Sequence, residues 1–264
     1  MTREPAVPPY DPETYWNTRA HQYAGDPIRA VCLDDADENR CIDRIQRHLL
    51  RAAVRRLKRR TTLAGRAVLD YGCGTGRWVT FLRQHGLVYA GVDVAEEMLA
   101  LARRCEPDAA FQRIDGNRLP HPDRCFDVVW SIAVVHHNPY DVQEQIIAEM
   151  ARVLRDDGAV ILFEGLGPHN VCDTNYFPRP LQDWLELAAR HGLSCTWRRG
   201  ATYMLLRPLV SRTARWMSPA RLESWRRLLT YIDAVVDPYL LSLLPRRYHT
   251  RAVMLFERTG TRPR

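Results

Sequence analysis

The sequence lacks the features that mark a membrane-spanning, exported or disulfide-stabilised chain. It has no uninterrupted run of about eighteen apolar residues, so we expect no transmembrane helix. Residues 1–15 contain four prolines and no apolar core segment, which argues against a signal peptide. The seven cysteines are an odd number, and no two of them form a C-x-x-C pair. We therefore expect a cytoplasmic protein with reduced thiols and no metal site.

The net charge of +7 depends on one short stretch of the chain. Residues 51–60 contain six cations and no acid, so the rest of the chain carries only about +1. Such a stretch can bind phosphates, which leaves nucleic acid as an alternative partner. On a helix, cations with apolar stems more often form a solvated face, and we favour that interpretation. The six cations are Arg51, Arg55, Arg56, Lys58, Arg59 and Arg60.

Strand and helix patterns alternate beyond Gly65, which is typical of βαβ units. Strands are predicted at 66–71, 87–93, 109–114, 126–135, 159–164, 193–197 and 251–257, and helices at 76–85, around 98–102, at 140–154 and at 180–191. Asp157-Gly158 is expected to turn the chain into the fifth strand. The sequence therefore predicts an α/β fold: a doubly wound, mostly parallel, seven-stranded Rossmann-like sheet with helices on both faces.

Two segments fall outside this alternation. Residues 1–62 form an N-terminal helical cap, in which helical apolar spacing from Glu38 predicts a long amphipathic helix ending near Thr61. Residues 63–264 form the main domain, with a helical insertion at about 200–249 that includes a helix start at Ser218-Pro219. This insertion is interpreted as a lid over a pocket, a homodimer contact or a membrane-surface helix, and the sequence does not decide between them.

Residues 67–76, Ala-Val-Leu-Asp-Tyr-Gly-Cys-Gly-Thr-Gly, form the most informative motif. An apolar strand ends in Asp70, and glycines follow at every second position. Glycine permits positive φ and a close approach of the backbone to a ligand. The carboxylate of Asp70 would repel a pyrophosphate and attract a cation, and neither common phosphate-loop spacing fits the motif.

This motif resembles the first motif of class I S-adenosylmethionine-dependent methyltransferases, and the similarity continues in matching order over residues 66–164. Phe126–Ser131 is similar to the F-D-x-V strand of that family, and Arg152–Gly158 is similar to its R-x-L-x-x-x-G run. Val94-Ala95 departs from the Ser cap that often follows the second strand. The chain is most similar to the UbiE-like, small-molecule branch.

The resemblance implies S-adenosylmethionine as the cofactor and S-adenosylhomocysteine as the product. It places the backbone of Gly72, Cys73 and Gly74 at the amino-acid part of the cofactor, with Asp70 on its ammonium group. It assigns the ribose to Asp93, whose carboxylate can accept hydrogen bonds from both ribose hydroxyls. Asp115 would accept from the adenine amino group; Asn117 is interpreted either as its neighbour at the ring or as a turn former. The remaining implied cofactor contacts are Val94, Met98, Gly116 and Ser131.

The acceptor side is expected beyond the fourth strand, where His136 and His137 follow it. Either histidine is a candidate base, although we favour a packing or cofactor-shaping role for at least one of them. Glu164 is a further candidate base or acceptor ligand. Asn138-Pro139 is interpreted as a helix start with Asn138 as the N-cap. Tyr10, Tyr15, Trp16 and Tyr23 would either wall the pocket or pack beneath the N-terminal segment.

These features predict methyl transfer to oxygen, nitrogen or carbon of a small-molecule acceptor, in secondary-metabolite or quinone-type biosynthesis. Two alternatives remain at this point. One is an RNA or tRNA methyltransferase that uses residues 51–60. The other is a cyclase that binds S-adenosylmethionine without transferring its methyl group.

Overall fold

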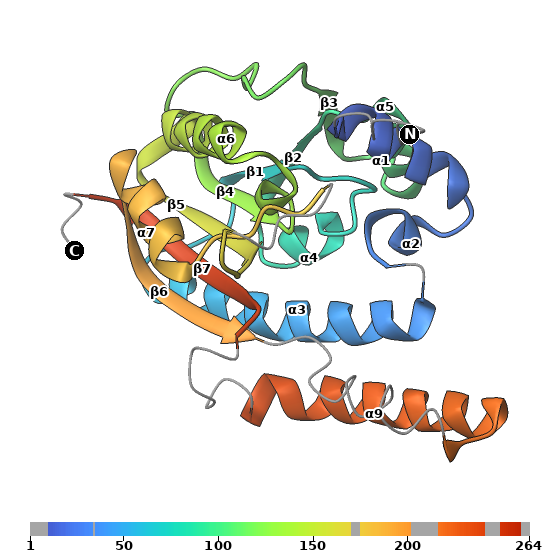
Figure 1. Ribbon diagram of the computed structural model, residues 1–264. Helices are drawn as coiled ribbons and strands as arrows, with labels where there is room; N and C mark the ends of the chain where they lie inside the picture. Colours follow the sequence, from blue (N-terminus) through green and yellow to red (C-terminus); the bar gives the residue numbers. More distant parts are fainter. Residues whose placement is uncertain (1–9, 34, 170–174, 202–215, 241–248, 260–264) are drawn as a thin grey trace, which may run out of the picture.

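The computed structural model describes residues 10–33, 35–169, 175–201, 216–240 and 249–259. They form one seven-stranded sheet in the order β3-β2-β1-β4-β5-β7-β6 (Figure 1). The strands are β1 (Ala67–Tyr71), β2 (Val88–Asp93), β3 (Ala110–Arg113), β4 (Phe126–Ile132), β5 (Leu154–Gly165), β6 (Leu193–Ala201) and β7 (Arg251–Arg258). The helices are α1 (Pro12–Gln22), α2 (Pro27–Val31), α3 (Ala36–Lys58), α4 (Val79–Arg83), α5 (Glu96–Cys105), α6 (Tyr140–Val153), α7 (Leu181–Arg190) and α9 (Pro219–Leu240), with a 3₁₀ turn η1 (Val135–His137).

The first five strands of the sheet are parallel, and β7 runs antiparallel between β5 and β6. The carboxyl ends of β1 to β5 therefore meet at one edge, where ligands bind in open α/β sheets. The doubly wound, mostly parallel fold predicted from the alternating pattern is confirmed.

Successive residues of the central strands enter two different cores because strand side chains alternate between the faces of a sheet. In β4, Val128 and Trp130 pack with α3 and α4, whereas Val129 packs with α6 and α7. The same alternation runs through β5 from Ala159 to Phe163. Both faces are thus covered, which explains why these strands are almost continuously apolar.

Two predicted boundaries near the end of β4 are wrong. The strand was expected to reach residue 135, but it stops at Ile132 because Ala133 has φ +60°, which breaks the extended conformation. Asn138 is not the N-cap of α6: Pro139 occupies that position and the helix begins at Tyr140. The Asn138 side-chain amide instead donates to the Val134 carbonyl at 3.0 Å, so this hydrogen bond spans the turn formed by residues 135–137.

The expected turn at Asp157-Gly158 is also wrong. The chain passes from α6 directly into β5 at Leu154, which pairs with Phe126. The pairing of β4 with β5 shifts register between Phe126 and Val128, which accommodates the additional residues of β5 between Leu154 and Ala159. The strand therefore continues through Asp157 and Gly158.

Part of the predicted insertion lies outside the described residues, namely 202–215 and 241–248. Within the described part, α9 begins at Pro219 as predicted and packs along α3, which separates it from the sheet (Figure 1). The basic stretch covers the last part of α3 and the two residues after it. Arg51, Arg55 and Arg59 are exposed, while Arg60 forms an ion pair with Glu257.

Candidate functional site

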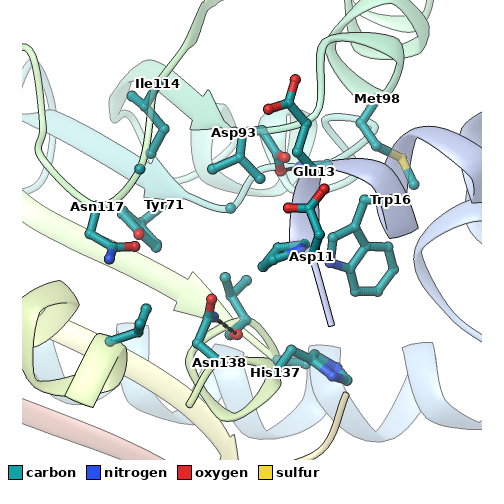
Figure 2. Close-up of a pocket in the computed structure, with 18 of the residues that line it drawn as sticks. Asp11, Glu13, Trp16, Tyr71, Asp93, Met98, Ile114, Asn117, His137 and Asn138 are labelled. Carbon is teal, nitrogen blue, oxygen red and sulfur yellow. Dashed lines mark hydrogen bonds between the residues drawn. The ribbon is translucent and has the colours of Figure 1, made fainter. Parts of the chain in front are cut away.

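A cavity of about 440 Å³ lies at the carboxyl edge of the sheet. It is lined by the glycine turn after β1, the ends of β2 and β3, the segment after β4, and α1 with the two residues before it. Val31 of α2, Met98 of α5 and Val142 of α6 complete the lining. In Figure 2, Asp93, Met98 and Ile114 lie on the upper side of the cavity, and His137 and Asn138 lie on the lower side. The cavity therefore has two chemically different ends.

The glycine turn has the positive φ angles that its spacing suggested. Gly72 has φ +69°, and a Cβ atom there would lie 2.5 Å from the Cγ atoms of Val134. Gly74 has φ +52°, and its Cβ would lie 2.7 Å from Cγ1 of Val31. The segments before η1 and before α3 can therefore pack against the turn only because both positions are glycine.

Asp93 joins the glycine turn to the next strand. Its Oδ2 accepts from the Gly74 N–H at 2.8 Å, and its Oδ1 accepts from the Ala95 N–H at 3.0 Å. Burial raises the pKa of this carboxyl, while the two N–H donors act in the opposite direction. Each carboxylate oxygen has a second lone pair, so Asp93 can still accept from hydroxyls in the cavity that it lines.

Asp70 lies behind the glycine turn and is not part of the cavity lining. Its carboxyl is 1% exposed and accepts from the Tyr89 hydroxyl at 2.9 Å. Burial raises the pKa of Asp70 to about 8, so the carboxyl is largely protonated near neutrality. This placement gives no support to the expected contact with an ammonium group, since desolvation removes the charge on which that contact depends.

Two more expected cofactor residues, Cys73 and Ser131, are buried outside the lining. Burial raises the pKa of the Cys73 thiol, which makes it an inert packing group. Five other expected residues do line the cavity at the end near β2 and β3: Val94, Met98, Asp115, Gly116 and Asn117. Asn117 also donates to Gln145 on α6 at 3.1 Å, so it both lines the cavity and fixes its own loop.

His137 lies at the other end of the cavity. Its Nδ1 is 2.6 Å from the carbonyl oxygen of Asn175, which can only accept, so Nδ1 carries the proton. The neutral ring therefore has its lone pair on Nε2. Burial lowers the pKa of His137 to about 3, so the ring stays neutral at physiological pH. The indole of Trp16 meets the ring edge to face at 5.5 Å between centroids.

His136 and Glu164 do not reach the cavity. They are 2% and 0% exposed, and the Nδ1 of His136 lies 2.5 Å from the Oε2 of Glu164. The carboxyl of Glu164 is turned toward η1 and is enclosed by protein, so the structure does not place it at the acceptor as the expected base or ligand. The same holds for His136 as a base.

Helix α1 and its N-cap residue line part of the cavity, and their acids were not predicted from the sequence. Asp11 caps α1 by accepting from the Thr14 N–H at 3.1 Å, and Glu13 pairs with Arg113 of β3 at 2.8 Å. Both acids line the cavity, as do Tyr10 and Trp16. The pair Asp11-Pro12, an N-cap residue followed by proline at the first helical position, was a signal that could have located this helix.

The lining suits a cationic nucleoside. Four carboxyl groups lie on it, from Asp11, Glu13, Asp93 and Asp115, and apolar groups such as Met98 and Ile114 lie beside the two last named. In the described ranges of the chain there is no cluster of three metal-ligating side chains. Among those same residues, no helix has the length and apolar character needed to cross a membrane.

Comparison with known proteins agrees with this geometry. The family model described as "Methyltransferase domain" matches residues 69–162. The chain is 36% identical to methyltransferase GfsG of Streptomyces halstedii over 106 residues, which cover 38% of this chain and 37% of that protein. It is 34% identical to phosphatidylethanolamine N-methyltransferase of Cereibacter sphaeroides over 114 residues, covering 41% of this chain and 55% of that protein. The chain thus spans about half or less of the length of these two relatives.

Among solved structures, magnesium protoporphyrin IX methyltransferase of Synechocystis PCC 6803 with bound S-adenosylmethionine has the same fold. The TM-score is 0.60 at 17% identity, covering 96% of this chain and all of that chain. Fold, motif order and family match point the same way: residues 69–162 match a family model described as a methyltransferase domain, and the sheet has the fold of a solved methyltransferase with bound S-adenosylmethionine.

Proposed function

We propose that the protein transfers the methyl group of S-adenosylmethionine to a small-molecule acceptor. The observation that carries this proposal is one cavity that contains the glycine turn and Asp93 at one end and His137 at the other. A cofactor bound at the first end would present its methyl group toward the second. S-adenosylmethionine would supply a methyl group activated by its sulfonium sulfur: the acceptor atom would bond to the methyl carbon as the carbon–sulfur bond breaks, and S-adenosylhomocysteine would leave.

The residues at the cofactor end fit this ligand. Gly72 and Gly74 would lie against its amino-acid part, Asp93 would accept from the ribose hydroxyls, and Asp115 would accept from the adenine amino group. The apolar Met98 and Ile114 would pack against the ring. Because Asp93 also accepts from the Gly74 N–H, one carboxyl would couple the ribose to the turn beneath the methionine part.

His137 would orient the acceptor. Its Nε2 lone pair can accept from a hydroxyl or N–H group, and a pKa of about 3 keeps that lone pair available. The same low pKa makes His137 a weak proton acceptor, so we infer that it aligns the acceptor more than it deprotonates it. Methyl transfer gains most from alignment of the two reactants and from exclusion of water. Trp16 and the other residues of α1 that line the cavity would exclude the water.

The test has two parts. Calorimetry with S-adenosylhomocysteine measures cofactor binding, and S-adenosylhomocysteine release is then followed with a panel of phenols, alcohols, amines and enolisable ketones. Cofactor binding together with stoichiometric methylation of at least one compound supports the proposal. A rearranged product without S-adenosylhomocysteine would instead indicate a cyclase. Failure to bind the cofactor would overturn the proposal.

A further inference from the structure

The turn that presents His137 is held in place by a carboxyl group from the neighbouring strand. Glu164, near the end of β5, accepts from two backbone N–H groups of η1. Its Oε1 lies 3.2 Å from the Val135 nitrogen and its Oε2 lies 3.1 Å from the His136 nitrogen. These are the first N–H groups of a helical turn, which have no partner within the turn itself.

The position of one proton follows from a third hydrogen bond. The Gly165 N–H donates to Nδ1 of His136 at 3.1 Å, so Nδ1 must have a lone pair directed toward that region. The Oε2 of Glu164 lies 2.5 Å from the same nitrogen. Two acceptors cannot approach so closely without a proton between them. The carboxyl must therefore carry that proton, and its O–H and the Gly165 N–H share the single in-plane lone pair of Nδ1.

The surroundings agree with an uncharged pair. Burial raises the pKa of Glu164 to about 7 and lowers the pKa of His136 well below its ordinary value. The positive charge of Arg251 on β7 further lowers the pKa of His136 and disfavours an imidazolium. The other titratable groups packed against His136 are His137, at 4.3 Å between ring centroids, and Tyr176, at 5.3 Å.

The segment after β5 completes the arrangement. The Phe177 N–H donates to the His136 carbonyl at 2.7 Å, and the Asn175 carbonyl accepts from His137. Both backbone sides of η1 are thereby fixed, one by Glu164 and one by residues 175–177. The direction of the His137 ring depends on both supports.

We propose that Glu164 and His136 are positioning residues for methyl transfer: protonated Glu164 donates to Nδ1 of neutral His136, and together they hold η1 so that Nε2 of His137 faces the acceptor. The role of His137 rests on the function proposed above. The position of the proton and the support of the turn do not, because they can be measured in the protein without substrate.

The experiment is nitrogen-detected NMR of the imidazole rings in the full chain labelled at histidine, with His136→Asn and His137→Gln used to assign the signals. In the wild type, His136 should be neutral with its proton on Nε2, and His137 should be neutral with its proton on Nδ1. These tautomers are expected below about pH 7, where Glu164 keeps its proton, and neither ring should become charged down to about pH 5. A proton on Nδ1 of His136 would overturn the proposal.

Two variants separate positioning from simple stability. In Glu164→Gln the side-chain amide can still donate to Nδ1, so both rings should keep their wild-type tautomers. The His136 N–H loses its acceptor, because it now faces the amide nitrogen, and stability should fall. In Glu164→Leu no donor remains, so His136 should become a mixture of tautomers and the His137 signals should move. The control is Asp127→Asn, which removes a buried carboxylate that accepts from the Ala67 N–H at the opposite end of β4. It should lower stability and leave both rings unchanged.

Unchanged His137 signals in a folded Glu164→Leu protein would refute the positioning role. If that variant does not fold, the wild-type tautomers and the Glu164→Gln spectrum still decide the question. S-adenosylhomocysteine affinity, measured on the same samples, should stay close to wild type because neither residue lines the cavity. If the wild type does not bind S-adenosylhomocysteine, the proposed function is contradicted, but the tautomer result stays valid.

Discussion

Replacing Asp93 with Asn tests the link between the glycine turn and the cofactor. Both carboxylate oxygens of Asp93 accept from backbone N–H groups, of Gly74 and of Ala95. An Asn side chain has one carbonyl oxygen, so one of these N–H groups must face an amide donor. Leaving a buried N–H without an acceptor costs about 1–3 kcal/mol, and we expect the free energy of unfolding to fall by that amount.

The same change removes a charged acceptor from the ribose hydroxyls. Hydrogen bonds to charged groups contribute about 1.5–3 kcal/mol, which corresponds to about a 10- to 150-fold weaker Kd. Calorimetry with S-adenosylhomocysteine measures the affinity, and urea unfolding measures the stability. The matched control is Asp108→Asn, which makes the same change at an exposed position outside the cavity. A Kd within about twofold of wild type, together with unchanged stability, would refute both the ribose assignment and the geometric argument.

Three further predictions concern the glycine turn, Trp16 of α1 and the buried carboxyl of Glu164. Gly72→Ala should lower the free energy of unfolding by more than the roughly 1–2 kcal/mol cost of a left-handed backbone, because its Cβ would overlap Val134. Gly65→Ala, whose Cβ would have nothing within 4 Å, measures the backbone cost alone. In denaturant unfolding, adding Val134→Ala to Gly72→Ala should recover the stability lost beyond that backbone cost. Trp16→Ala removes the aromatic contact with His137, worth about 0.5–1.5 kcal/mol, and should lower the free energy of unfolding by at least that amount in urea unfolding. Tyr231→Ala, 62% exposed on α9, is the control, and equal losses in both variants would contradict the importance of the Trp16–His137 contact. Burial raises the pKa of the Glu164 carboxyl from 4.5 to about 7, so between these pH values the folded state binds more protons than the unfolded state. The stability of the wild type relative to Glu164→Gln should therefore fall by up to about 3 kcal/mol as the pH rises from 4.5 to 7. A stability difference in urea unfolding that does not change with pH would contradict this.

The sequence predicted those parts of the fold that depend on local chemistry. The spacing of Gly72, Gly74 and Gly76 requires positive φ wherever the turn lies, and all three have it. Strand and helix order followed from apolar periodicity, because each strand of a covered parallel sheet is apolar on both faces. The end of β4 could not be found in this way. Val134 and Val135 extend the apolar run, whereas the positive φ of Ala133 arises from tertiary contacts.

The candidate site divides in the same manner. Asp93 was identified from its position after a strand, and it lines the cavity. Asp70 occupies an equivalent position after β1 but is enclosed by Tyr89, which lies on another strand. Glu164 and His136 are 28 residues apart, and their pairing depends on β5 lying beside β4. No local pattern distinguishes a buried acid of this kind from one that faces a ligand.

The position of β7 affects the order in which the sheet can be completed. β7 lies between β5 and β6 and pairs with both, although β6 precedes it in the chain by about fifty residues. During synthesis, β5 and β6 emerge before residues 251–258 and cannot pair with each other in the native order. Each therefore presents an unpaired edge until β7 is inserted. The nascent chain is consequently open to wrong strand pairing for longer at this half of the sheet than at β1 to β4, whose partners are all made earlier.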